Sequence, residues 1–353
     1  MDADIAERFA SASRLRQKRP ASRIFLLPPA DVMTITNQIK AILTAAVTCV
    51  AFVIVDWTAR FPYTFPDLQN YRIGFESGWY VFSVINLDWL RFMLAEGLWV
   101  YGFDALWRWT GNIDTSFYIV SLFATFLIAY HIFVRTRSYI ATLFIFNPAF
   151  VNLVIEQLRS GLAAAIFFTA TRIKRPLIQA PLFVAALSIH TSFLLFVSIY
   201  YIYRLAEWSK IKRWLDKRFL LAMAITFALA FVVSYFRDFA LSSLGDGRAF
   251  VQDDQTSGVL LGIGWALFLV TFYLVRSDEE AGFDLYFFAL NVFMFAASIF
   301  MGTYGSRFVA IGVPALAVMS RYVRPNRRIL FYTHYFLFSG LYFWIWAGTG
   351  GTA

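Results

Sequence analysis

The stretch from residue 116 to residue 134 reads SFYIVSLFATFLIAYHIFV and contains no acidic or basic side chain other than one histidine. An α-helix rises about 1.5 Å per residue, so this run nearly spans the roughly 30 Å apolar layer of a bilayer. It therefore predicts a transmembrane helix.

Similar apolar runs recur on both sides of this one. They cover residues 41–55, 139–155, 161–170, 177–203, 219–235, 259–275, 285–301, 308–319 and 329–346. The 353-residue sequence is 59% apolar, 20% aromatic and only 15% charged, with a mean hydropathy of +0.61. Soluble domains are roughly 45–50% apolar and about 25% charged. The composition excludes a soluble enzyme and a disordered chain, and it predicts an all-α, polytopic transmembrane helical bundle.

The distribution of basic residues predicts the topology of this bundle. Lysine and arginine outnumber acids in the loops at 135–137, 172–175, 204–218 and 321–328, and loops rich in basic residues stay in the cytoplasm. To keep 172–175 and 204–218 on one side, the run 177–203 must turn back on itself near His190-Thr191-Ser192. We expect a hairpin of two short or broken helices there, and about eleven passes with the N-terminus in the cytoplasm and the C-terminus outside.

We expect three parts along the chain. Residues 1–37 form a cytoplasmic basic arm that could include an interfacial helix, 38–347 a single integral membrane domain with outer loops 58–114 and 237–255, and 348–353 a short periplasmic tail. The apolar run Leu94–Leu106 is too short for a full span, and glycine and charge flank it, so we interpret it as a re-entrant or interfacial helix.

Negative observations restrict the chemistry. The sequence has no P-loop, no G-x-G-x-x-G, no H-E-x-x-H and no Cys/His cluster with zinc spacing, and its single cysteine, Cys49, excludes a disulfide framework. We expect neither a cofactor nor a metal ion. Most of the basic residues behind the net charge of +9 lie in the predicted cytoplasmic segments. This distribution predicts membrane lipid rather than nucleic acid as a partner.

The predicted topology leaves ionisable side chains from five separate segments on the outer face. They are Asp67, Arg72 and Glu76 in the first outer loop, Glu156 with Arg159, His190, Arg248, and Arg307. Charges near lipid are costly and tend to line cavities, so one interpretation is a shared site. The other is a set of scattered, solvated charges.

The residue types at this face suit one kind of chemistry. Several arginines around a cavity can bind a phosphate or diphosphate through bidentate hydrogen bonds and a charge that never titrates. A nearby aspartate, glutamate or histidine could act as a general base toward a sugar hydroxyl. Glu156 stands three residues before Arg159 and could orient it as an i,i+3 pair.

Three short motifs resemble those of the EpsG/Wzy-type polysaccharide polymerases, which are bacterial membrane glycosyltransferases. They are Glu156-Gln157-Leu158-Arg159-Ser160-Gly161-Leu162-Ala163, then Ser188-Ile189-His190-Thr191-Ser192, and upstream Pro66-Asp67-Leu68-Gln69-Asn70-Tyr71. The resemblance covers roughly residues 60–195. Ser160 departs from the glutamine that many members carry there, so any contact made by that glutamine is not expected here.

The resemblance implies a GT-C-like helical fold and metal-independent glycosyl transfer at the periplasmic side of the bacterial inner membrane. The implied substrates are an undecaprenyl-diphosphate-linked glycan donor and acceptor, and a chain-length regulator protein is an implied partner. On this hypothesis Arg159, Arg307 and Arg248 bind the diphosphate. Asp67 is the first choice for the base, with Glu76 and His190 as alternates. Glu156, Tyr71, Asn70 and Gly161 support the site.

Two other functions stay open at this stage. The first is a GT-C glycosyltransferase that adds a single sugar from a polyprenyl-phosphate donor. The second is a flippase or transporter of lipid-linked glycans, which would favour cations along a central path and often an internal repeat. No repeat is visible in the sequence, and the candidate cations gather at one face.

Overall fold

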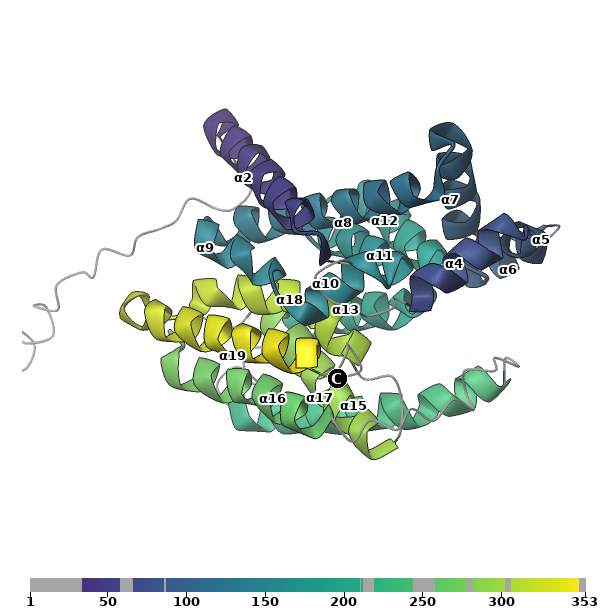
Figure 1. Cartoon of the computed structure of the whole chain (residues 1–353). Helices are drawn as coiled ribbons and strands as arrows, with labels where there is room; N and C mark the ends of the chain where they lie inside the picture. The colour runs from purple at the N-terminus through teal and green to yellow at the C-terminus, as the bar shows by residue number, and fades with distance from the viewer. Residues whose placement is uncertain are drawn as a thin grey trace, which may run out of the picture. The chain divides into compact units, whose positions relative to one another are not determined.

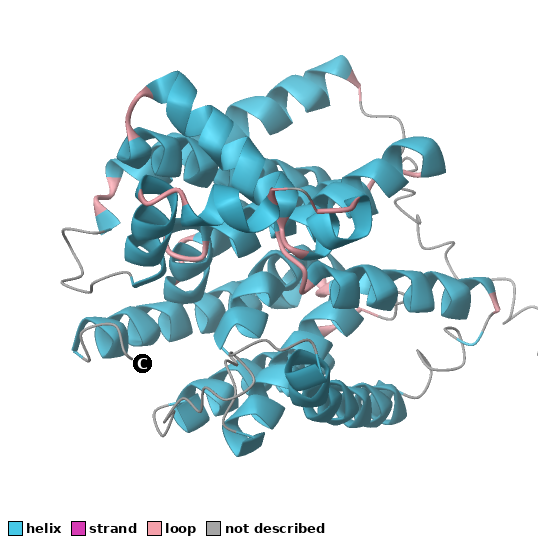
Figure 2. Cartoon of the chain, turned by 90° about the vertical axis from the view of Figure 1, so that its right-hand side faces the viewer, coloured by secondary structure: helices cyan, strands magenta, loops and turns pink. Residues whose placement is uncertain are grey.

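The computed structural model describes residues 34–57, 66–85, 87–209, 211, 219–243, 258–277, 282–301 and 306–348. The chain divides into a first unit, residues 1–40, and a second unit, residues 41–353. All described helices except the first residues of α2 belong to the second unit. Every element in the described part is helical, apart from one isolated bridge between Arg276 and Val323, as Figure 2 shows. The all-helical fold predicted from the sequence is therefore confirmed.

The helices follow one another along the chain with short connections. They are α2 (Ile35–Ile54), α4 (Pro66–Glu76), α5 (Trp79–Val84), α6 (Trp89–Leu94), α7 (Gly97–Thr110), α8 (Ile113–Thr136), α9 (Tyr139–Thr142), η1 (Leu143–Ile145), α10 (Pro148–Ile155), α11 (Leu158–Thr171), α12 (Pro176–Ile189), α13 (Phe193–Trp208), α15 (Phe219–Ser243), α16 (Gly258–Val275), α17 (Phe283–Met301), α18 (Ser306–Met319), η3 (Ser320–Tyr322), η4 (Pro325–Arg327) and α19 (Arg328–Gly348).

Helix α8 contains the apolar run 116–134. Its first turn is capped by Asn112, whose side chain accepts a hydrogen bond from the Thr115 backbone nitrogen at 3.0 Å. The helix ends at Thr136, and its C-cap residue, Arg137, adopts a left-handed backbone conformation with φ 56°. Among the described residues, α2 and α8 are long and apolar enough to cross a membrane, and α10 with α11 adds a third span if that bent pair counts as one. The count of eleven passes stays a prediction.

The run 177–203 forms two helices, α12 and α13, and the chain turns between them at His190-Thr191-Ser192. This is the hairpin that the charge pattern predicts. Helix α12 begins at Pro176, at a position where a proline's missing N–H is not needed. The break therefore puts His190 at the C-cap of α12, where its backbone is extended rather than helical.

The segment 58–114, predicted as an outer loop, is helical over most of its described residues, and its placement outside the membrane stays a prediction. Pro66 and Asp67 open α4, where the acid suits the positive end of the helix dipole. Asp88 caps α6 by accepting from the Arg91 backbone nitrogen at 2.9 Å. The run 94–106, expected as one element, is split because α6 ends at Leu94 and α7 begins only at Gly97.

The second predicted outer loop, 237–255, is helical over its first part because α15 continues to Ser243. Residues 244–255 lie outside the described residues, as do 1–33 and 349–353 of the predicted terminal segments. Figure 1 shows α4 to α7 grouped near the N-terminal end of α8, whereas α9 follows its other end. Helices α4 to α7 and their connections supply half of the residues of the candidate site.

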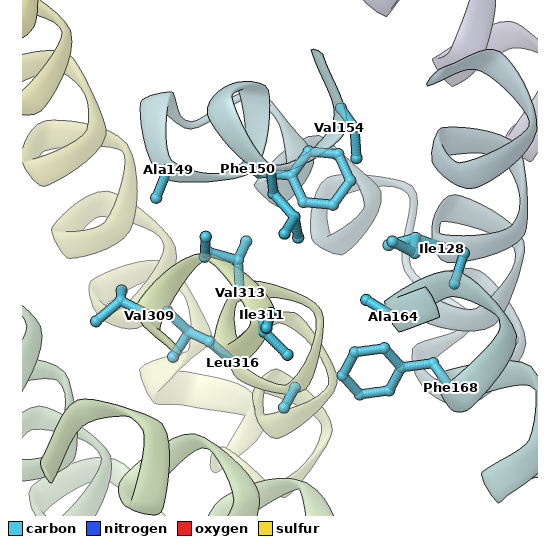
Figure 3. Close-up of a cluster of buried hydrophobic side chains, with 14 of the residues drawn as sticks. Ile128, Ala149, Phe150, Val154, Ala164, Phe168, Val309, Ile311, Val313 and Leu316 are labelled. Carbon is cyan, nitrogen blue, oxygen red and sulfur yellow. The ribbon is translucent and has the colours of Figure 1, made fainter. Parts of the chain in front are cut away.

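The core joins helices that are distant in sequence. Phe150 and Val154 of α10 are buried against α8, α11 and α18, which contribute Ile128, Phe168 and Val313 (Figure 3). Helix pairs α17 with α18, and α11 with both α8 and α12, pack along much of their length. This packing fixes the ends of α11, α12 and α18, where the candidate site residues lie.

A sharp bend of 103° separates α10 from α11. Gly161 makes this close turn sterically feasible, because a Cβ at this position would stand 2.6 Å from the Leu153 carbonyl oxygen and 3.1 Å from the Val154 Cα. Small residues let helix backbones approach closely. Gly161, two residues after Arg159, therefore sets the course of α11 and, with it, the position of Arg159.

Candidate functional site

Helix α4 anchors two arginines that come from distant parts of the chain. Asp67 accepts a hydrogen bond from Arg307 of α18, with 3.0 Å between Oδ2 and Nη2. Tyr71 accepts one from Arg159 of α11, with 3.1 Å between the hydroxyl oxygen and Nε. Residues four apart on a helix are neighbours on its surface, with about 5–6 Å between their Cβ atoms. The structure therefore brings the two predicted diphosphate ligands together on one face of α4.

Glu96 completes this arrangement, and it is the residue that the sequence analysis missed. It lies between α6 and α7 and is 7% exposed. One carboxylate oxygen pairs with Nη1 of Arg159. The other, Oε1, lies 2.5 Å from Nδ1 of His190 and accepts from the Thr191 backbone nitrogen at 3.3 Å. We call Asp67, Tyr71, Glu96, Arg159, His190 and Arg307 the polar cluster.

The charges of the polar cluster act on one another. Burial by itself would raise the pKa of Glu96, but the facing His190 and Arg159 overcome this and hold its pKa well below the usual range. Burial raises the pKa of Tyr71, while Arg159, Asp67 and Arg307 all act on the same hydroxyl. Glu96 is therefore ionised, and both arginines lie within electrostatic reach of Tyr71.

Glu156 has a different partner from the one expected. It is buried in the connection between α10 and α11, where its carboxylate accepts a hydrogen bond from the Asn152 side chain. Gln157 in turn donates to Asn152 at 2.7 Å. The prediction that Glu156 orients Arg159 is wrong, because Tyr71 and Glu96 bind that guanidinium instead. Glu156 is nevertheless close to the polar cluster, because Asp67 and Arg307 both act on its carboxyl group and the Asp67 backbone donates a hydrogen bond to it.

Two further predicted residues, Glu76 and Asn70, do not join the polar cluster. Glu76 lies nine positions after Asp67, and at about 100° per residue it projects from the opposite face of α4. There it is exposed and stands 4.0 Å from Arg72. Asn70 is exposed as well. Arg248 falls outside the described residues.

The polar cluster combines an anion-binding part with a proton-accepting part. Arg159 and Arg307 supply two guanidiniums that are partly exposed, at 22% and 30% of their side chains. Beside them, His190 presents an imidazole whose Nε2 has no hydrogen-bond partner among the described residues. In the same part of the chain, no three His, Cys, Asp or Glu side chains gather closely enough to hold a metal ion.

The geometry defines an all-helical membrane protein with a partly buried ionic site shared by α4, the α6–α7 connection, α11, α18 and the α12–α13 turn. A protein-family comparison then identifies the family, because the model of the EpsG family matches residues 45–351. The chain belongs to the EpsG family, and the matched range includes the whole polar cluster. Membership indicates a polysaccharide-polymerase type of role. Comparisons with curated proteins and with solved structures found no significant match.

Proposed function

We propose that this protein is a membrane glycosyltransferase that polymerises undecaprenyl-diphosphate-linked oligosaccharide repeat units at the periplasmic face of the bacterial inner membrane. The observation that carries the proposal is the pair of guanidiniums, Arg159 and Arg307, held on one face of α4 beside His190. Family membership supports the same role, and the distribution of basic residues supports this orientation.

The reaction transfers a glycan from one lipid carrier to another. The acceptor hydroxyl attacks the anomeric carbon of the donor, a new C–O bond forms, and the bond to the diphosphate breaks with its electron pair. Undecaprenyl diphosphate leaves, and a base takes the hydroxyl proton. The main electrostatic problem is the negative charge that develops on the diphosphate.

Arg159 and Arg307 stabilise this negative charge with their fixed positive charges and directed N–H groups. Removing one such donor from a transition-state site typically costs about 2.7–4 kcal/mol. Without substrate, Glu96 and Asp67 neutralise the two guanidiniums. The diphosphate competes with these carboxylates for the same N–H groups. In this proposal the arginines, rather than a metal ion, bind the leaving group.

The test is a reconstituted reaction. Purified protein in liposomes is incubated with a synthetic lipid-linked repeat unit, and the products are resolved on a gel. We expect a ladder from the wild type and a loss of roughly 10²–10³-fold in rate from Arg159→Ala or Arg307→Ala. Arg204→Ala, which removes an exposed arginine of α13, is the control and should retain the ladder.

The same gel separates the alternatives. A single added sugar from a polyprenyl-phosphate donor would indicate the one-step glycosyltransferase. A flippase would leave the glycan unchanged and move it across the liposome membrane. Either outcome contradicts the polymerase, and so would full ladders from both arginine variants in folded protein. Addition of a chain-length regulator to the reaction should narrow the ladder's length distribution.

A further inference from the structure

We propose that His190 is the general base of this transfer and that Glu96 is the positioning residue that makes it one. The inference rests on the proposed function and deepens it. It replaces Asp67 as the first choice for the base. It also gives a role to a glutamate that no sequence motif marks.

The contact between Glu96 and His190 fixes which imidazole nitrogen is available. An ionised carboxylate can only accept hydrogen bonds, so Nδ1, at 2.5 Å from Oε1, must carry a proton. The nitrogen that can accept a proton is then Nε2. This is the logic by which a carboxylate holds a histidine in its reactive tautomer in other hydrolytic and transfer enzymes.

The carboxylate is itself held in place from the histidine's own segment. The Thr191 backbone nitrogen and the Thr191 hydroxyl both lie 3.3 Å from Oε1. The same hydroxyl donates to the Leu94 carbonyl oxygen at 3.1 Å. The α6–α7 connection and the α12–α13 turn are thus tied together by several bonds around one carboxylate oxygen.

The backbone of Glu96 supports a specific role for this position. Its φ is 60°, in the left-handed region that favours glycine, and the next residue in the sequence is a glycine that does not take up this conformation. Strained conformations of this kind persist where surrounding structure requires them, and they concentrate at functional sites. Here the strain places a buried carboxylate between Arg159 and His190.

Asp67 is less suited to accept a proton. Its carboxylate is bound to Arg307, with 3.0 Å between Oδ2 and Nη2, so an acceptor hydroxyl must compete with that guanidinium for the carboxylate. The Glu96 carboxylate is likewise bound to an arginine, Arg159. In the described part of the chain His190 pairs with no guanidinium, and its Nε2 has no hydrogen-bond partner there.

The proton balance follows from these contacts. Nε2 takes the proton of the acceptor hydroxyl as its oxygen bonds to the anomeric carbon, and the diphosphate departs with the electron pair. The resulting imidazolium lies beside the Glu96 carboxylate, which stabilises it. Arg159 and Arg307 also face His190 and oppose its positive charge. The imidazolium then returns its proton to water.

Glu96 and the two arginines act on His190 with opposite charges. Substituting them should therefore shift the pH profile in opposite directions. In a pH profile of the polymerisation rate, the low-pH limb reports protonation of the base. Glu96→Gln removes the stabilising carboxylate, so the limb should move to lower pH by about one unit, with the rate at its plateau reduced at least tenfold. Arg159→Gln removes an opposing positive charge, so the limb should move to higher pH. His190→Asn should lower the rate by roughly 10²–10⁴-fold.

A second measurement does not depend on activity. The ¹⁵N NMR signals of the histidine side chains are recorded against pH in wild type and Glu96→Gln, with His190→Asn used to assign His190. We expect the Nδ1–H tautomer in the wild type and a lower titration midpoint in Glu96→Gln. Glu207→Gln, which changes an exposed glutamate on α13, is the matched control and should leave rate, limb and midpoint unchanged.

The outcomes separate the two proposals. If the wild type makes a ladder but His190→Asn keeps its rate, or Glu96→Gln leaves limb and midpoint unmoved, the base assignment is overturned and the polymerase stands. If the wild type makes no product from any lipid-linked repeat unit, the proposed function fails and the base assignment fails with it.

Discussion

Arg159 is bound by two residues on different elements. Its Nε donates to the Tyr71 hydroxyl, its Cζ lies 5.1 Å from the centre of the Tyr71 ring, and its Nη1 pairs with Glu96. Guanidiniums form directed hydrogen bonds and also stack on aromatic faces. Tyr71 therefore fixes both the position and the plane of this side chain, which a simple surface arginine would not need.

This dual contact predicts the effect of Tyr71→Phe. The ring and its contact stay, but the hydroxyl that accepts from Nε is lost, and hydrogen bonds to charged groups contribute about 1.5–3 kcal/mol. We expect the polymerisation rate to fall by roughly tenfold or more, with the melting temperature little changed. Rate and thermal unfolding are measured on the same preparation. An unaltered rate would show that Tyr71 does not orient Arg159.

At this scale the sequence predicted residue types better than partners. Asp67, Tyr71, Arg159, His190 and Arg307 all appear in short motifs or at helix ends, and the structure brings them together. Glu96 had a weaker signal, because it only interrupts an apolar run before Gly97. Nothing local indicates that its partners are Arg159 and His190, which are 63 and 94 residues away. Such pairings depend on helix packing that single motifs do not specify.

Among the elements, the bent pair of α10 and α11 has the strictest steric requirements. The two helices turn by 103° across two residues, and the connection is filled by Glu156 and its bond to Asn152. Arg159 lies in the first turn of α11. The angle of this bend therefore decides where the guanidinium meets Tyr71 and Glu96.

We predict that Gly161→Ala is destabilising, although alanine favours helices by about 1 kcal/mol over glycine. The added Cβ would stand 2.6 Å from a backbone oxygen of α10, which cannot rotate away. Overpacking of this kind costs about 1–3 kcal/mol. Thermal unfolding in detergent should show a lower midpoint than wild type. Gly102→Ala, at a helical glycine with nothing within 4 Å of an added Cβ, is the control and should not lower it.

The sequence also predicted the elements unevenly. Long apolar runs gave the positions of α8, α16, α17 and α19, because hydrophobicity alone identifies helices of that length. Within the predicted outer loop 58–114 the sequence predicts a helix only at 94–106, because the residues before it are polar and aromatic and form no long apolar run. The helical form of α4 to α7 depends on local caps such as Asp88 and on packing against α8 and α12. Tertiary contacts of this kind leave little periodic signal.

In the whole molecule, a second buried ion pair joins helices that are distant in sequence. Arg135 at the end of α8 donates to Asp284 at the start of α17, with 2.8 Å between Nη2 and Oδ2. Asp284 is almost fully buried. The Arg321 side chain reaches the Arg135 carbonyl oxygen at 3.5 Å. This contact connects α8 with the C-terminal helices far from any motif of the family.

We predict that Asp284→Asn lowers the free energy of unfolding by about 1–3 kcal/mol, because it leaves a partly buried guanidinium without its counter-charge. The exposed pair Arg204–Glu207 is the comparison. Glu207→Gln should cost no more than about 1 kcal/mol, since solvent screens surface pairs. Reversible unfolding in mixed micelles measures both. Equal effects of the two substitutions would contradict a structural role for Asp284.

Asp67 and Tyr71, which bind the two arginines, both lie on α4, a helix of eleven residues. Such a short helix moves as one body, so a displacement of Asp67 also displaces Tyr71. On the proposed function, a diphosphate that releases Arg307 from its carboxylate is expected to shift α4 and with it the contacts of Arg159. We then expect substrate binding at the two arginines to be cooperative.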